Sequence, residues 1–141
     1  MAVINQIYGT TTTLTVTGLG TLANGSSVIS ATVDNTTNLF LDVQVEVVFA
    51  TAAGATATGT LEVWAKESID NTDFDDDSND TLIAVAVLAA AGVQTRKRIV
   101  HLASVFGGSI PPYWQLRIRN ATGAALTSAS VAYRGVYLQS V

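Results

Sequence analysis

The sequence predicts an all-β fold, an antiparallel β-sandwich of jelly-roll-like type with about eight strands, and a barrel is the alternative. Three observations support this prediction. Apolar and polar residues alternate in several segments, and turn-forming sequences separate these segments at short spacing. No segment shows the apolar period of an amphipathic helix. The length of 141 residues suits a single domain.

The clearest predicted strand spans residues 39–49. Its apolar face consists of Leu39, Leu41, Val43, Val45, Val47 and Phe49. Its other face carries Asp42, Gln44 and Glu46. Residues 61–66 and 113–120 alternate in the same way, and we expect their charged side chains on an outer face. Weaker strands are predicted at residues 11–17, 28–34, 82–90, 94–106 and 128–139.

The first ten residues show no alternation of their own. We therefore expect an N-terminal arm over residues 1–10 and a single sandwich domain over residues 11–141. The arm carries three large apolar side chains, which make it the candidate partner interface: Ile4, Ile7 and Tyr8.

Residues 67–80 contain seven of the eleven carboxylates in the chain. An EF-hand loop has glycine at its sixth position and glutamate at its twelfth, and neither a loop starting at Asp70 nor one starting at Asp73 provides them. We expect a solvated hairpin loop, with no metal and no cofactor. Loose cation binding by the aspartates at alternate positions is the alternative.

Acids and bases are segregated along the chain. All eleven acids lie in residues 1–80 with a single base, Lys66, whereas residues 81–141 hold six bases and no acid. Two arrangements would neutralise this distribution. Strands from the two halves pair within one copy, or the acidic face of one copy meets the basic face of another.

The residues that usually perform catalysis are scarce. The chain has no cysteine, its single histidine is His101, and it has no G-x-S-x-G turn. On the predicted strand 94–106, His101 shares a face with Lys97 and Ile99, which indicates a partly exposed sheet position. We expect no catalytic residues and no enzymatic activity.

Charge and hydropathy argue against nucleic acid and membrane partners. The net charge is −4, and the basic run Arg96–Arg98 lacks the interleaved aromatics that stack bases. The longest uncharged apolar run, residues 82–92, is too short to span a bilayer, and residues 1–13 lack the pattern of a secretory signal. We expect a soluble protein that is made in a cytoplasm.

The two tryptophans and Tyr113 have two interpretations. An exposed Trp or Tyr can stack on a sugar or anchor an interface. Alternatively, both tryptophans fill the core between the two sheets. We expect this second position for Trp114, and by a narrower margin for Trp64.

Three stretches together resemble the head decoration, or cementing, proteins of tailed bacteriophages. They are LANGSSVISATVDNTTNLFLDVQVEV (22–47), ATGTLEVWAKES (57–68) and VFGGSIPPYWQLRIRNATGAAL (105–126). The resemblance covers most of the chain between Leu22 and Leu126 and includes no catalytic signature.

This resemblance implies a β-sandwich that sits on the outer surface of the phage head as a homo-oligomer, made in the host cytoplasm. Its partner would be the major capsid protein, whose neighbouring subunits it would bridge. Cementing requires a rigid scaffold and many simultaneous weak contacts. A carbohydrate-binding module, or a tail or fibre adhesin built on the same sandwich, is the alternative function.

Overall fold

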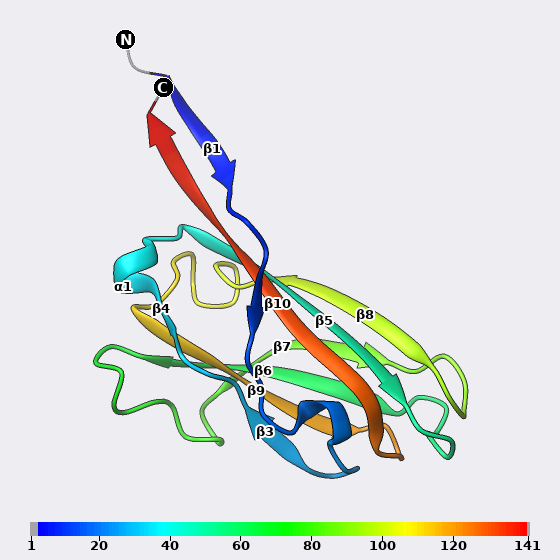
Figure 1. Ribbon diagram of the computed structural model, residues 1–141. Helices are drawn as coiled ribbons and strands as arrows, with labels where there is room; N and C mark the ends of the chain where they lie inside the picture. The colour runs from blue at the N-terminus through cyan, green and yellow to red at the C-terminus, as the bar shows by residue number, and fades with distance from the viewer. Residues whose placement is uncertain (1–2, 141) are drawn as a thin grey trace.

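The computed structural model describes residues 3–140, which form ten β-strands in two antiparallel sheets (Figure 1). The strands are β1 (Ile4–Tyr8), β2 (Thr12–Leu14), β3 (Ser27–Ile29), β4 (Val33–Asp34), β5 (Asp42–Thr51), β6 (Thr60–Ser68), β7 (Thr81–Val87), β8 (Thr95–His101), β9 (Tyr113–Ala121) and β10 (Leu126–Ser140). The short helices are η1 (Leu19–Thr21) and α1 (Asn35–Asn38). No helix within the described residues has the length and apolar character to cross a membrane.

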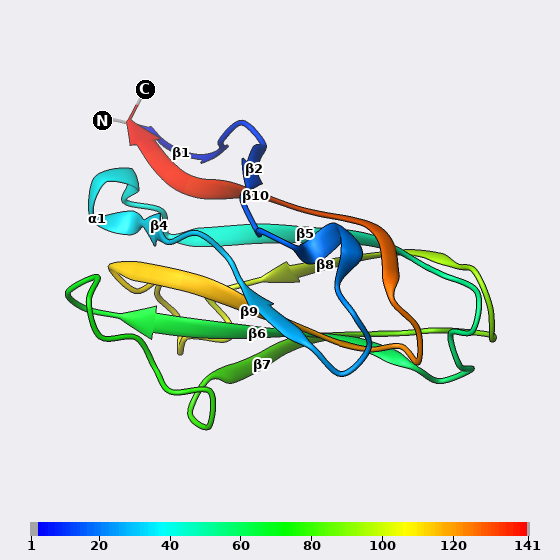
Figure 2. The same ribbon diagram turned by 60° about the horizontal axis from the view of Figure 1, so that its bottom comes forward.

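The strands divide into two layers (Figure 2). Sheet A has the order β1-β10-β5-β8, and β2 also pairs with β10. Sheet B has the order β3-β9-β6-β7, and β4 also pairs with β9. This arrangement confirms the predicted antiparallel sandwich. It has two more strands than expected, because the predicted strand 28–34 is divided into β3 and β4 and because residues 4–8 form β1.

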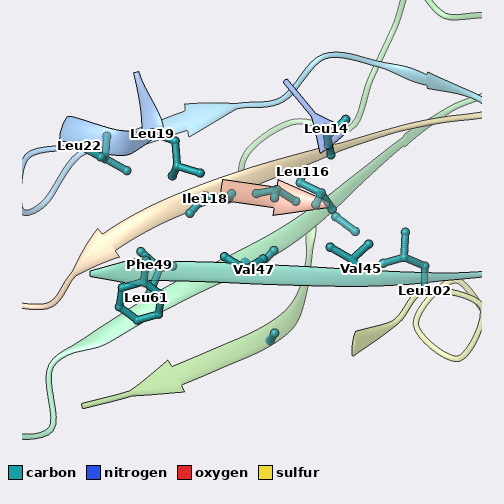
Figure 3. Close-up of a cluster of buried hydrophobic side chains, with 14 of the residues drawn as sticks. Leu14, Leu19, Leu22, Val45, Val47, Phe49, Leu61, Leu102, Leu116 and Ile118 are labelled. Atoms are coloured by element: carbon teal, nitrogen blue, oxygen red, sulfur yellow. The ribbon is translucent and has the colours of Figure 1, made fainter. Parts of the chain in front are cut away.

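The core lies between the two layers and is built by alternate residues of the long central strands (Figure 3). Strand β5 contributes Val43, Val45, Val47 and Phe49, as its sequence pattern predicts. Leu61, Leu116 and Ile118 of sheet B face them. Trp114 is fully buried and makes an edge-to-face contact with Tyr133, with 5.6 Å between the ring centroids. The core position expected for Trp114 is therefore confirmed.

On the N-terminal side of the fold, one prediction is wrong, and the expected arm has a structure that its sequence pattern does not indicate. Leu39 and Leu41 were assigned to the inward face of a strand, but β5 starts at Asp42 and both leucines are exposed. Residues 4–8 of the expected arm show no alternation in the sequence, but they form β1 and pair with the end of β10. At Leu39 a local capped turn ends the alternation, whereas β1 forms because it pairs with a strand far away in the sequence.

Strand β10 has two parts with different environments. Its first part pairs with β5 and β2 inside sheet A, and its last part pairs with β1. Figures 1 and 2 show β1 and the end of β10 projecting together from the sandwich, with the described ends of the chain at their tip. Ile4 pairs with Ser140 there.

Candidate interaction site

The most prominent surface feature is this projecting pair of strands, which we call the ribbon: β1 together with residues 136–140 of β10. Opposite residues of an antiparallel pair point to the same face. The register places Ile4, Gln6 and Tyr8 on one face of the ribbon with Leu138. On this face Ile4 is 64% exposed, Leu138 56% and Tyr8 52%. The ribbon thus presents large apolar side chains to solvent.

Two further leucines lie beside the ribbon, in the connection between α1 and β5. Leu39 and Leu41 line a hollow of about 350 Å³ together with Tyr137 and Leu138 of β10. Leu39 is 70% exposed. We call Leu39, Leu41 and Leu138 the leucine cluster. Exposed leucines around one concave surface are typical of protein contacts rather than of free solvent.

The position of Leu39 is fixed by the turn around α1. Asp34 caps the helix, because its carboxylate accepts a hydrogen bond from the Thr36 N–H at 2.8 Å. The side-chain oxygen of the buried Asn35 accepts from the Phe40 N–H at 2.8 Å. Leu39 lies between these anchors with φ of 54°, in the left-handed region that a leucine rarely adopts. The turn therefore holds an apolar side chain outward at a conformational cost.

A hydrogen-bonded chain of side chains crosses the outer face of sheet A. The Asp42 carboxylate lies 2.7 Å from Nδ1 of His101, so Nδ1 carries the proton of the neutral ring. Nε2 of His101 then accepts from the Gln44 amide at 3.2 Å, and the Gln44 oxygen accepts from Nε of Arg134 at 2.5 Å. The Arg134 guanidinium lies over the ring of Tyr8, 5.0 Å from its centroid. The chain thus links strand β8 to the base of the ribbon.

These hydrogen-bonded side chains do not place a nucleophile next to a base. His101 is exposed, as its strand pattern predicts, but Nε2 faces an amide rather than a hydroxyl. The Asp42 carboxyl experiences opposing effects on its pKa. Burial raises it, while hydrogen bonds from His101 and from the backbone N–H groups of Ala103 and Val43 lower it. The hydrogen bonds prevail, and the pKa lies below its ordinary value of 3.8.

The acidic segment 67–80 is the connection between β6 and β7, and its second half covers two bases of sheet B. Lys66 Nζ lies 2.6 Å from an oxygen of Asp77. Arg117 donates from Nε and Nη2 to the two oxygens of Asp80, at 2.5 and 3.0 Å. The side chains of Lys66 and Arg117 point away from the core, as predicted, but they are buried under this segment. Sequence alone suggested a wholly solvated loop.

Within the described residues, no group of three or more histidines, aspartates or glutamates is arranged to hold a metal ion. Three carboxylates of the segment have partners within the chain, since Asp75 accepts from the Glu67 N–H at 3.3 Å, Asp77 pairs with Lys66 and Asp80 pairs with Arg117. Asp70 accepts from the backbone N–H groups of Thr72 and Asp73, which lower its pKa together with the Ser68 hydroxyl. The geometry therefore offers a closed turn rather than a ring of free oxygens.

The basic run does not form one patch. Lys97 lies on the outer face of sheet A and pairs with Glu46 at 2.6 Å. Arg96 and Arg98 stand opposite Phe49 and Val47, whose side chains point to the inner face. On sheet B, Arg119 pairs with Glu62 at 3.5 Å, and Arg117 is covered by Asp80. These pairs between the acidic and basic halves form within one copy, the first of the two arrangements considered above.

The three aromatic candidates for sugar stacking, Trp64, Tyr113 and Trp114, are all at least half-buried. Trp114 is in the core. Trp64 points out of sheet B and is half-buried, so the narrow expectation of a core position is wrong for this residue. One face of its ring is covered by the Arg117 guanidinium at 4.9 Å. Tyr113, the other candidate, is half-buried at the start of β9.

Of the predicted interface residues, the structure places Ile4 and Tyr8 on the exposed face of the ribbon and Ile7 on its opposite face. Sequence reasoning missed the leucine cluster. Leu39 and Leu41 continue the alternation of β5 in the sequence, which predicts a core position, and Leu138 lies within the predicted strand 128–139. The available signal was the sequence DNTTN before Leu39, which is a helix-capping pattern and interrupts a strand.

No family model matches this chain, and no curated protein matches it. Several solved structures of low sequence identity do. The xylan-binding module CBM15 is 17% identical over 96% of this chain and 97% of its own, with a TM-score of 0.45. A Clostridium thermocellum structure containing the CBM22-1 and GH10 modules of xylanase 10B is 12% identical over 86% of this chain, with a TM-score of 0.46.

A third match is the module CBM35 from Cellvibrio japonicus Abf62, 14% identical over 84% of this chain and 67% of its own, with a TM-score of 0.37. This chain spans about a quarter (26%) of the length of the xylanase structure. At these identities and scores, the ligands named for those proteins do not transfer to this chain. The β-sandwich assignment rests on the strand pairing described above.

Proposed function

We propose that this protein is a head decoration protein of a tailed bacteriophage, which binds the outer surface of the shell and bridges neighbouring major capsid protein subunits. The sequence resemblance suggests this role, and one structural observation supports it most directly. A rigid sandwich carries a projecting ribbon whose exposed face and flanking leucine cluster are apolar.

The ribbon is a suitable attachment device for physical reasons. A two-stranded ribbon in isolation is marginally stable in water. A partner that covers its exposed apolar residues would stabilise the ribbon and bury those residues at the same time. Contact with a partner would remove Ile4, Tyr8 and Leu138 from water. The binding free energy gained is about 25 cal/mol for each Å² of apolar surface that is buried. The sandwich contributes a fixed base from which the ribbon reaches the partner.

The conformation of Leu39 supports the same proposal. A left-handed backbone costs a non-glycine residue about 1–2 kcal/mol, and this residue gains little from packing within its own chain because its side chain is exposed. Glycine or asparagine would occupy the position with less strain. A leucine there is explained if its side chain contacts the shell.

Attachment of many copies would stabilise the assembled shell. Each copy that binds two neighbouring subunits favours the assembled state by mass action, and a contact made at several points is stronger than any of its parts. Decoration of this kind needs no chemical step. The protein would be found on the head surface of the virion.

The test is co-sedimentation of the purified protein with empty phage heads. We expect Leu39→Asn and Leu138→Asn each to lower the affinity for heads about tenfold or more, because each removes apolar contact at the leucine cluster. Ile69→Asn is the matched control, since Ile69 is an exposed apolar residue in the acidic segment, outside the ribbon. Equal binding by all variants, or no binding by the wild type, would overturn the proposal.

A second candidate is a carbohydrate-binding module, and one observation favours it. A hollow of about 210 Å³ on the outer face of sheet A is lined by Gln44, Glu46 and Arg134, whose amide, carboxylate and guanidinium groups suit sugar hydroxyls. Glycan-array binding that Gln44→Ala abolishes would support this function. Head binding that Gln44→Ala leaves intact would support the first.

A further inference from the structure

We propose that two copies of this chain associate through antiparallel pairing of their β1 strands, about a two-fold axis at Gln6. The inference concerns self-association in solution and does not rest on the proposed attachment to a shell. It follows from the backbone groups that β1 leaves free, from the contrast between β1 and the other strand edges, and from the side chains that the pairing brings together.

The hydrogen bonds of the ribbon show which backbone groups of β1 are free. The Gly9 N–H donates to the Gly135 oxygen at 2.8 Å, and the register places these two residues opposite each other. Hydrogen-bonded pairs alternate along an antiparallel ladder. Ile7 and Asn5 therefore turn their backbone groups toward β10, and the intervening residues Ile4, Gln6 and Tyr8 turn theirs to the open edge of sheet A.

The open edge of β1 lacks the features that usually prevent strand pairing. Its sequence INQIY contains no charge, proline or glycine, and β1 is at the end of the strand order of sheet A. The opposite edge, β8, carries three consecutive bases, Arg96–Arg98. Strands β2, β3 and β4 are only two or three residues long, and β7 lies against β8. Natural sheets protect their edges with such charges and short strands, so β1 is the unprotected edge strand of sheet A.

The register of the pairing follows from these free groups. Gln6 is the middle one of the three outward-facing residues, so a two-fold axis at Gln6 places Gln6 opposite Gln6 and Ile4 opposite Tyr8 of the second copy. Every outward-facing N–H and C=O of the three residues then has a partner. A slip of one residue would place inward-facing backbone groups opposite outward-facing ones and lose these bonds.

The side chains agree with this register. Ile4 and Tyr8 are both exposed. In the dimer, Ile4 of each copy would contact Tyr8 of the other copy, which is a cross-strand pair of a β-branched and an aromatic residue. On the other face Asn5 would lie opposite Ile7. No charges of the same sign oppose each other, because Arg134 is the one charged residue of β1 and β10. The strand supplies its own complement, which favours a second copy over a foreign strand as the occupant.

Sedimentation equilibrium of the purified chain tests the association. We expect a reversible monomer–dimer equilibrium, and we expect Gln6→Pro to raise its dissociation constant about tenfold or more. Proline at position 6 removes an N–H that faces outward, so the bonds between β1 and β10 remain. The urea midpoint therefore stays unchanged when it is measured at a protein concentration below the dissociation constant, where both proteins are monomeric. Ile69→Pro in the acidic segment is the matched control and should still dimerise. A monomeric wild type, a trimer, or a dimer that tolerates Gln6→Pro would overturn the proposal.

Disulfide trapping tests the register. Because the chain has no native cysteine, any disulfide must join two introduced cysteines. Opposite residues of a hydrogen-bonded antiparallel pair have Cα atoms about 5.5 Å apart, within disulfide range. We expect the Gln6→Cys variant to form a covalent dimer under mild oxidation. Asn5→Cys and Ile7→Cys should do so at least about tenfold more slowly, since each would lie opposite a different residue. Equal rates at the three positions would contradict the register. Neither experiment contains phage heads, so both can fail while head binding persists.

Discussion

Sheet B contains two buried bases, Lys66 and Arg117, and each lies beside a carboxylate of the acidic segment. The Asp80 side chain is completely buried and that of Arg117 nearly so. The hydrogen bond with Asp80 raises the pKa of Arg117, against burial, which lowers it. The guanidinium therefore stays charged, and it requires Asp80 as its partner.

We expect Asp80→Asn to lower the free energy of unfolding by about 3 kcal/mol, because the substitution removes the nearest carboxylate from the buried Arg117 charge and leaves only the more distant Asp77, at 3.8 Å. Urea denaturation followed by tryptophan fluorescence measures the change. Asp73→Asn, an exposed acid of the same segment, serves as control and should lie within about 0.5 kcal/mol of the wild type. Equal stability of the two variants would show that the buried pair contributes nothing.

Asp42 gives the fold a defined pH dependence. Its pKa in the folded protein lies below the ordinary value of 3.8, so its contribution to stability is fully present above that value and is lost as pH falls through the folded pKa. We expect the urea midpoint of the wild type to fall between pH 5 and about pH 3. Asp42→Asn should be less stable than the wild type at pH 7, with the difference shrinking at pH 3. A constant difference at both pH values would contradict the assignment.

At the scale of elements, the packing at the base of the ribbon requires a close approach between the Phe40 ring and the backbone of Gly135. Phe40, from the connection between α1 and β5, packs over Gly135 of β10, and a Cβ atom there would collide with the ring. We expect Gly135→Ala to destabilise the protein by about 1–3 kcal/mol through overpacking. Gly20→Ala, where a Cβ would meet only an ordinary contact, is the matched control. Thermal unfolding of the two variants measures the difference, and similar melting temperatures would show that Phe40 moves freely.

Strand β1 pairs with β10 alone, so it adds little to the sandwich itself. We expect a chain without residues 1–10 to retain the far-UV spectrum and most of the stability of the full protein, while its attachment to phage heads weakens. The deletion exposes Val136, which is buried in the full chain, so a small loss of stability is expected. Undiminished head binding by the shortened chain would place the contact elsewhere.

How far sequence predicts these elements depends on whether local alternation decides the structure. It does in β5, where Val43 to Phe49 point inward as predicted, because one face of a central strand must be buried. It fails at Leu39, because a capped turn with a left-handed residue ends the alternation before the strand begins. It fails for β1 as well, because the pairing partner of β1 lies more than 120 residues away (Ile4 with Ser140) and leaves no local pattern.

The sequence predicts only the part of the candidate site that lies within one segment of the chain. Ile4 and Tyr8 stand out as apolar residues in an otherwise unpatterned segment, and the structure exposes both. Their neighbours Leu39 and Leu138 reach the same region only through the fold. The cover that Asp77 and Asp80 form over Lys66 and Arg117 was likewise hidden, since a run of acids in sequence is usually solvated.

At the scale of the whole molecule, four bases are neutralised by acids within each copy. The pairs Lys66–Asp77, Lys97–Glu46, Arg117–Asp80 and Arg119–Glu62 join acids to bases inside the fold. The ribbon and the leucine cluster, by contrast, contain no charged residue. Contacts between this protein and a larger assembly should therefore depend on apolar surface more than on Coulomb attraction.

Salt dependence separates these two driving forces. Exposed charges are screened within about 8 Å at physiological ionic strength and within about 3 Å at 1 M, whereas apolar burial is not weakened by salt. We expect the affinity for phage heads to change less than about twofold between roughly 0.05 M and 0.5 M sodium chloride. Co-sedimentation across this series measures it. If the affinity fell tenfold or more, the contact would involve charges that the fold leaves unpaired. Arg98 on β8 and the exposed aspartates of residues 67–80 would be the first residues to replace. Attachment would then occur through the sandwich rather than through the ribbon.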